Sequence, residues 1–264
     1  MRETRLEMKI ESKQGRYSRS WAVGALAGAR YVGRDMTAVR CTLDAQLAHD
    51  GFYTSATRTN PSIFRIGRYL LTQDAEFEVQ GPLTGGEGEV VAIRDGGEIF
   101  ISVGSDQCDR EIDPLFPDKP KQMCPHPIAT VAWSYTEVKD HWDQLRIYGE
   151  VFVAGHGVPL QDAALAELVD LEYLLTLPEL DSLPDALVLY CGAAPFLTVV
   201  AEDAIARHGL PEETAQGIGE RFLVRLHDPV LERTIEHHFA ALPLGDELAE
   251  RRFFRRRISK PNTK

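Results

Sequence analysis

The sequence predicts an α+β fold that is rich in short strands. Short apolar stretches recur along the 264 residues and are bounded by Gly, Pro, Asn and Asp, which is typical of strands joined by turns. Only a few segments repeat apolar residues at the spacing of an amphipathic helix, and they are scattered among the strands. This order differs from the regular alternation of strand and helix that builds a parallel sheet. No internal repeat, low-complexity linker or clear domain boundary interrupts the pattern.

The expected elements can be placed along the chain. The predicted strands cover residues 8–12, 75–80, 87–93, 98–103, 146–154, 186–191, 222–226 and 234–240. The predicted helices cover residues 35–49, 136–145, 161–175 and 199–207. The first helix is predicted because Val39, Leu43 and Leu47 share one face, and Asn60-Pro61 lies beyond its end. The helix over 161–175 is predicted because its leucines and alanines fall near one face.

The composition is consistent with a soluble enzyme. Apolar residues make up 44% of the chain, which provides enough material for a core. A net charge of −11 opposes binding to nucleic acid, because that binding depends on Lys and Arg neutralising phosphates. No apolar run of about 18 residues predicts a transmembrane helix, and the charged stretch from Met1 to Glu7 does not resemble a secretory signal. We therefore expect a cytoplasmic protein with no nucleic-acid or membrane partner.

Two further features of the composition have ordinary interpretations. The basic cluster from Arg251 to Arg257 is typical of a solvated tail, and contact with an anionic surface is the less common alternative. The four cysteines, at 41, 108, 124 and 191, lack paired zinc-ligand spacing and are expected to be thiols in a reducing compartment.

Three carboxylates between two apolar strands form the main candidate site. Glu87 and Glu89 point to the same face of a strand because side chains two residues apart do so. Asp106 follows the next strand, which the turn at 94–97 joins to the first. Each piece alone is also typical of a solvated sheet face or a loop-closing turn, but polar residues at the ends of buried strands favour a site. Mg²⁺ or Mn²⁺, which prefer oxygen ligands, would offset the repulsion among these carboxylates.

Other residues near this cluster carry possible chemistry. Lys121 follows in a proline-rich loop and would stabilise an oxyanion or move a proton, the latter more easily if burial lowers its pKa. Arg110 could bind a substrate carboxylate or pair with Glu87 or another neighbouring acid. Cys108 lies between two aspartates that disfavour a thiolate, so a residue lining the pocket is expected there instead of a nucleophile.

The motif around Asp106 resembles an element of the fumarylacetoacetate hydrolase superfamily. Asp106-Gln-Cys-Asp-Arg110-Glu111 is similar to the Asp-x-Ser-x-Arg-Asp of that superfamily, which also has Glu-x-Glu before it and an active-site lysine after it, here Lys121. Tyr148-Gly-Glu-Val151 is similar to its Asn-Gly-Glu segment, and Ala186 to Gly192 resembles its late glycine-ended strand.

The resemblance is closer to the DUF2848 branch of that superfamily, a family of unknown function. It covers roughly residues 30 to 240 and rests on the order of several short motifs. These motifs are Gly33-Arg-Asp35, Leu70-Leu-Thr72, Val79-Gln-Gly-Pro82, Gly104-Ser-Asp106, Lys121-Gln-Met-Cys-Pro125 and His141-Trp-Asp-Gln-Leu145.

The resemblance implies a fold, a domain division and a set of site residues. The implied fold is a mixed β-roll with peripheral helices, usually dimeric. Residues 31–245 would form the catalytic domain, 1–30 a peripheral N-terminal segment and 246–264 a basic tail. The implied metal ligands are Glu87, Glu89 and Asp106, with Mg²⁺ or Mn²⁺ as the cofactor. Lys121 would be catalytic, and Arg110, Gln107 and Cys108 would contact the substrate.

The sequence departs from the family pattern at several positions. Gln107 and Cys108 replace the His and Thr that the branch usually has, and Ala193 replaces a threonine after the late glycine. The spacing from Glu89 to Asp106 is shorter than in typical members, which predicts a more open cleft. The paired His and Glu that activate water in the hydrolases have no counterpart by motif. His126, on the loop that carries Lys121, is our candidate for the missing histidine, and His156 is the alternative.

These observations leave three functions open. The first is a metal-dependent hydrolase or lyase that acts on a small 1,3-dicarbonyl or 2-oxo acid. It would cleave a carbon-carbon bond if water is activated, or catalyse decarboxylation, hydration or tautomerisation if it is not. The second is a metal-independent isomerase or cyclase that uses Lys121. The third is a family member that binds a ligand without catalysis.

Overall fold

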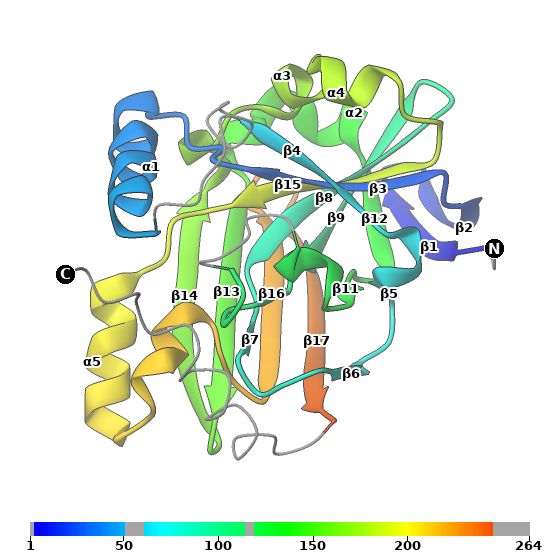
Figure 1. The fold of residues 1–264 in the computed structure, drawn as a ribbon. Coiled ribbons are helices and arrows are strands. Elements are labelled where there is room, and N and C mark those ends of the chain that lie inside the picture. Colours follow the sequence, from blue (N-terminus) through cyan, green and yellow to red (C-terminus); the bar gives the residue numbers. More distant parts are fainter. Residues whose placement is uncertain (1–2, 51–60, 114–118, 245–264) are drawn as a thin grey trace.

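The computed structural model describes residues 3–50, 61–113 and 119–244, and two mixed β-sheets form the body of these segments (Figure 1). Within them, the larger sheet has eight strands in the order β2-β1-β12-β9-β8-β15-β3-β4. These are β1 (Arg5–Ser12), β2 (Gly15–Ala22), β3 (Ala25–Arg30), β4 (Ser62–Ile66), β8 (Gly88–Asp95), β9 (Glu98–Ser105), β12 (Val131–Ser134) and β15 (Leu187–Ala193). The pairs β1/β12 and β3/β15 are parallel, and the other neighbours are antiparallel.

The smaller sheet has the order β14-β13-β16-β17-β6. Its strands are β6 (Glu76–Val79), β13 (Arg146–Val153), β14 (His156–Ala164), β16 (Arg221–Asp228) and β17 (Arg233–Pro243). Two short pairs lie apart from both sheets: β7 (Thr84–Gly85) with β10 (Cys108–Asp109), and β5 (Leu71–Thr72) with β11 (His126–Pro127). These pairs matter for function, because they belong to the segments that flank the candidate site.

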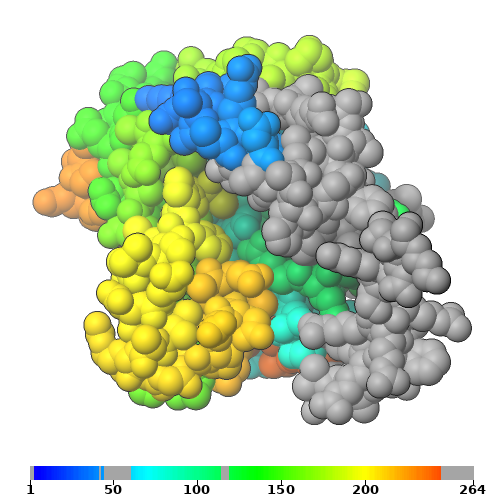
Figure 2. Space-filling view, turned by 60° about the vertical axis from the view of Figure 1, so that its left-hand side comes forward, coloured from blue at the N-terminus to red at the C-terminus, as the bar shows by residue number. Residues whose placement is uncertain are grey.

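Helices occupy the periphery of the two sheets. The α-helices are α1 (Met36–Asp50), α2 (Tyr135–Val138), α3 (Leu171–Leu175), α4 (Pro178–Asp181) and α5 (Thr198–His208). The 3-10 helices are η2 (Arg68–Leu70), η3 (Pro120–Gln122), η4 (Lys139–Gln144), η5 (Leu165–Glu167) and η6 (Glu212–Gln216). Figures 1 and 2 place α1 and α5 on the same side of the molecule, with cyan and green segments from the middle of the chain set back between them.

Two buried apolar clusters explain why the central strands are apolar on both faces. One cluster lies between the sheets and joins Val90 and Val103 of the larger sheet to Phe222 and Leu226 of the smaller. The other lies on the opposite face of the larger sheet and includes Leu6, Ile10, Val91, Ile93, Phe100, Val188 and Tyr190. Successive residues of β8 therefore bury their side chains in different layers, as the two-residue period of a strand requires.

Much of the predicted secondary structure is confirmed. Each predicted strand coincides with an observed one in whole or in part, and the α+β class is correct. The helix predicted over 35–49 is α1, and the Asp35 carboxylate accepts hydrogen bonds from the backbone N–H groups of Thr37 and Ala38 at its start. The helix predicted over 199–207 is α5, which ends at Gly209 in the left-handed conformation. The segment 136–145 is less regular than predicted, because α2 and η4 meet in it and His141 has non-helical backbone angles.

Two expectations are corrected by the structure. The helix predicted over 161–175 is wrong: its first residues belong to β14, and η5 and α3 follow. Leu165 of η5, Leu168 just after it and Leu171 of α3 are buried in the same core, so their spacing resembles the period of a single helix. Residues 1–30 were expected to be peripheral, yet β1, β2 and β3 are members of the eight-stranded sheet. The basic tail at 246–264 lies outside the described residues.

In the described part of the chain, every helix is too short or too polar to cross a membrane.

Candidate metal centre

The β8/β9 hairpin delivers the three predicted carboxylates to one place. Glu89 pairs with Gly104 in the antiparallel ladder, so Glu89 and Gly104 share a face of the hairpin. The ladder continues past the strand ends, because the Asp106 N–H donates to the Glu87 carbonyl at 2.9 Å. One carboxylate oxygen from each of Glu87, Glu89 and Asp106 lies within 4.8 Å of the other two. The strand alternation and the turn predicted this convergence from sequence.

The electrostatics of the three carboxylates differ from one residue to the next. Burial, together with the charge of Asp106, raises the pKa of Glu89 well above its usual range. Burial would also raise the pKa of Glu87, but the charges of Arg110, Lys121 and Arg30 outweigh it and hold that pKa at about 2. The site therefore stabilises a negative charge on Glu87 and disfavours one on Glu89.

The carboxylate of Asp106 is only partly satisfied by the protein. It is 1% exposed, and its Oδ1 has no hydrogen-bond donor among the described residues. A buried carboxylate oxygen without a donor is costly, and a bound ion is one established way to satisfy it. Together with the two glutamates it forms an all-oxygen donor set, which suits Mg²⁺ or Mn²⁺. The residues present thus fit a hard divalent cation.

Lys121 lies beside this cluster, fully buried at the centre of η3. Its ammonium pairs with the Asp106 carboxylate. Burial alone would lower the pKa of Lys121, but the charge of Asp106 outweighs burial and raises it above the ordinary value. The condition under which Lys121 would move a proton more easily, a pKa lowered by burial, is therefore not met, and a charged Lys121 is favoured.

His126 is also buried and adjoins both of these residues. Its Nε2 lies 2.7 Å from the Lys121 carbonyl oxygen, and its Nδ1 lies 3.3 Å from Asp106 Oδ1. Because a carbonyl only accepts, Nε2 must carry the hydrogen, and the Nδ1 of a neutral ring then presents a lone pair toward Asp106. Burial lowers the pKa of His126 despite the charge of Asp106, so the neutral ring is favoured. Two acceptors therefore face each other at the edge of the carboxylate cluster.

Arg110 is tied to the site by an ion pair. Its Nη2 donates to Glu87 Oε1 at 2.8 Å, which is the supporting role weighed for it from sequence. Gly85 makes this approach possible, because a Cβ at that position would lie 2.5 Å from Arg110 Nε. The guanidinium also lies 3.7 Å from Asp113, which joins it to a larger network of charges.

Gln107 and Cys108 differ in where they point. A Cβ at Gly86 would lie 2.8 Å from Gln107 Oε1 and 3.2 Å from the ring of Phe222, a residue of the smaller sheet. Gln107 therefore lies on the face of the hairpin away from the carboxylates and is not brought together with them. Cys108 is buried next to Gly85 in the β7/β10 pair, and burial raises the pKa of its thiol to about 12. A protonated thiol suits a lining residue more than a nucleophile.

The family follows from comparison with known proteins. The model of the DUF2848 family, whose function is unknown, matches residues 29–239. This chain belongs to the DUF2848 family. No curated protein matches it in sequence.

Solved structures show that this DUF2848 protein has the fold of the fumarylacetoacetate hydrolase superfamily. Fumarylpyruvate hydrolase from Pseudomonas aeruginosa, in complex with Mn²⁺ and pyruvate, is similar with a TM-score of 0.53 and 13% identity, over 92% of this chain and 98% of that one. 2-Keto-3-deoxy-D-arabinonate dehydratase, complexed with magnesium and 2,5-dioxopentanoate, has a TM-score of 0.55 and 15% identity, with 85% and 74% covered. 2-Hydroxyhepta-2,4-diene-1,7-dioate isomerase from Mycobacterium marinum has a TM-score of 0.52 and 13% identity, with 86% and 82% covered.

Arg30 is a charged neighbour of the site that the sequence reasoning missed. It ends β3, and its Nη2 pairs with Asp113 at 2.7 Å, which extends the Arg110 network. The available signal was its place at the end of an apolar strand, the same signal that identified the carboxylates. His156, the alternative base, is exposed at the turn between β13 and β14, where its ring stacks on His208 of α5.

Proposed function

We propose that this protein is a metal-dependent hydrolase or lyase that acts on a small 2-oxo acid or 1,3-dicarbonyl compound. The observation that carries the proposal is the convergence of Glu87, Glu89 and Asp106 within 4.8 Å, beside the buried ammonium of Lys121. Mg²⁺ or Mn²⁺ would be held by these three residues. Two similar structures support the ligand class, since one contains Mn²⁺ with pyruvate and another contains magnesium with 2,5-dioxopentanoate, both 2-oxo acids.

The chemistry divides between the cation and the side chains around it. A divalent cation in this position would polarise a chelated carbonyl and stabilise negative charge that develops on its oxygen. Lys121, charged and buried, would place a second positive charge near the same oxygen. Its raised pKa favours this electrostatic role over proton removal.

His126 is our candidate for moving a proton. Its Nδ1 lone pair faces the carboxylate cluster, while the hydrogen bond from Nε2 to the Lys121 carbonyl fixes the ring. A neutral imidazole can accept a proton from water, which hydrolysis of a carbon-carbon bond requires. Without such activation, the same site would support decarboxylation, hydration or tautomerisation. Arg110 would orient Glu87 and complete the positive edge of the pocket.

The test combines metal binding with a substrate panel. Chelator-treated protein is assayed with Mg²⁺ or Mn²⁺ on pyruvate derivatives, oxaloacetate and acylpyruvates, and we expect turnover that the chelator abolishes. Lys121→Met should bind metal but lose turnover by a factor of about 100 or more, because a charge near the developing oxyanion is removed. Lys119→Met, at an exposed position two residues earlier, is the matched control and should keep both metal binding and turnover. Turnover that survives chelation would contradict the proposal and select the metal-independent alternative.

A further inference from the structure

Gln161 connects the two sheets directly behind the carboxylates. It belongs to β14 of the smaller sheet and is 1% exposed. Its Oε1 accepts from the Gly88 N–H at 2.7 Å, and its Nε2 donates to the Gly88 carbonyl at 3.2 Å. One side-chain amide thus satisfies both polar backbone groups of the residue that lies between Glu87 and Glu89.

The same amide also reaches the segment that holds Glu89. Nε2 donates to the Ala194 carbonyl at 3.0 Å, just beyond β15. Two residues earlier, the Gly192 N–H donates to Glu89 Oε2 at 2.8 Å. Gln161 therefore joins β14, the start of β8 and the end of β15, and the last two of these set the position of Glu89.

Two glycines leave the space that this arrangement needs. A Cβ at Gly149, on the neighbouring strand β13, would lie 2.6 Å from Gln161 Oε1, and one at Gly88 would lie 3.1 Å from it. Either side chain would press on the amide oxygen that accepts from Gly88. The hydrogen bonds of Gln161 thus depend on small residues on both sides.

We propose that Gln161 is a positioning residue for the metal centre. By fixing the backbone at Gly88 and Ala194, it sets the separation at which Glu87 and Glu89 converge on one cation. This inference rests on the proposed function, because it assigns a supporting residue to the same metal site. It also relates Gly149 and Gly192 to the same site, since Gly149 leaves space for the Gln161 amide and the Gly192 N–H donates to Glu89.

The experiment measures Mn²⁺ affinity by calorimetry and stability by urea unfolding on the full chain. Gln161→Leu should weaken Mn²⁺ binding 10- to 100-fold, the usual cost of losing an outer hydrogen bond to a metal site. Gly149→Ala should also weaken Mn²⁺ binding, although Gln161 itself is retained, because the new methyl group would press on the Gln161 side chain. The electron paramagnetic resonance spectrum of bound Mn²⁺ should change in both variants, because the ligand geometry changes.

A matched control separates positioning from stability. Ser102, buried in β9, donates to the Val131 carbonyl at 2.7 Å and also ties a strand of the hairpin to its neighbour. Ser102→Ala should lower stability and leave Mn²⁺ affinity unchanged. Parent-like Mn²⁺ affinity in both Gln161→Leu and Gly149→Ala would overturn the positioning role of Gln161 and leave the proposed function standing. Failure of the parent protein to bind Mn²⁺ would overturn the proposed function, and this inference with it.

Discussion

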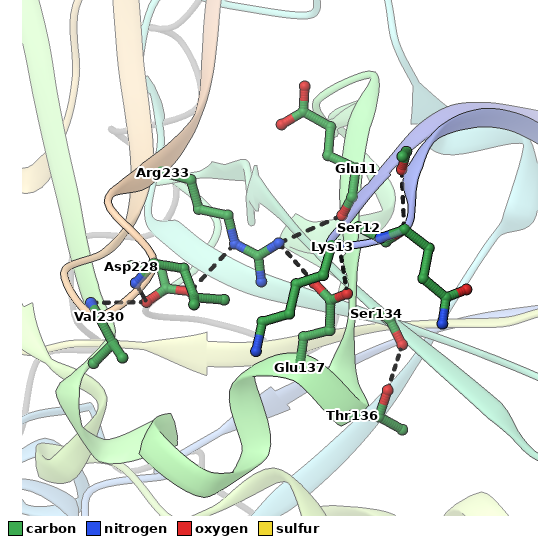
Figure 3. A network of polar contacts seen from close by, with 12 residues as sticks. Glu11, Ser12, Lys13, Ser134, Thr136, Glu137, Asp228, Val230 and Arg233 are labelled. Carbon is green, nitrogen blue, oxygen red and sulfur yellow. Dashed lines mark hydrogen bonds and ion pairs between the residues drawn. The ribbon is translucent and has the colours of Figure 1, made fainter.

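Two clusters of charged side chains in this molecule differ in how their carboxylates are satisfied. In the first, Arg233 of β17 donates to Asp228 at 3.2 Å and to Glu137 at 2.9 Å (Figure 3). Its guanidinium lies 4.4 Å from the centre of the Trp133 ring. Asp228, fully buried, also accepts from the N–H groups of Val230 and Leu231. In the second cluster, Glu87, Glu89 and Asp106 face one another, and one oxygen of Asp106 has no donor in the described part of the chain.

The difference distinguishes a structural cluster from a binding site. Burial would raise the pKa of Asp228, but the backbone N–H of Leu231 and the side chain of His141 outweigh it, and the pKa is lowered. The pKa of Glu89 is raised instead, because burial and Asp106 act together. A cluster whose buried carboxylate accepts its hydrogen bonds from the protein is suited to a structural role, whereas one that leaves a buried carboxylate oxygen without a donor is suited to bind a cation.

Breaking the Arg233 cluster should have the largest effect on stability. Asp228→Asn removes the fully buried carboxylate that Arg233 and His141 share, so we expect a loss of about 3–5 kcal/mol in the free energy of unfolding. Urea denaturation at neutral pH measures it, with the exposed Asp203→Asn of α5 as the control. Mn²⁺ affinity should not change. A loss below about 1 kcal/mol would place the Arg233 network among ordinary surface ion pairs.

A third buried group, His237, has no hydrogen-bond partner at its Nε2 among the residues that the structure describes. Burial and the neighbouring His238 lower its pKa from 6.5 to about 4. A histidine whose folded pKa is depressed contributes stability above its unfolded pKa, and this contribution is lost as pH falls from about 6.5 to about 4. We expect this group to lower the free energy of unfolding by about 3 kcal/mol as the pH falls through that range. His237→Phe should flatten the pH dependence there, whereas His208→Phe, at an exposed position of α5, should not.

Adding a divalent cation should stabilise the protein through the cluster of Glu87, Glu89 and Asp106. At about 100 times its Kd, Mn²⁺ should raise the free energy of unfolding by about 2.7 kcal/mol, because it binds the folded state alone. Glu89→Gln should remove this increment, while the metal-free variant should be at least as stable as the parent, since a repelling carboxylate is gone. The measurement is urea unfolding with and without Mn²⁺. An equal increment in both proteins would show that the cation binds elsewhere.

The sequence predicted the carboxylates of the site better than it predicted the residues that hold them in position. The alternation of Glu87 and Glu89 and the turn before Asp106 are local features, so the convergence of the three followed from strand geometry. The supports are not local. The helix wrongly predicted over 161–175 concealed Gln161, whose partners lie in other strands and whose role depends on the packing of two sheets. Arg30 and the place of β3 within the larger sheet were missed for the same reason, because only strand pairing places β3 beside β15.

The most direct test of the account is calorimetric titration of chelator-treated protein with Mn²⁺, on the parent, Glu89→Gln and Asp106→Asn. The account predicts one binding site in the parent and at least a 100-fold loss of affinity in both variants, because each removes a charged ligand from a set of three. Asp228→Asn should bind as the parent does. Absence of binding in the parent, or parent-like binding in both ligand variants, would contradict the claim that these three carboxylates hold a divalent cation.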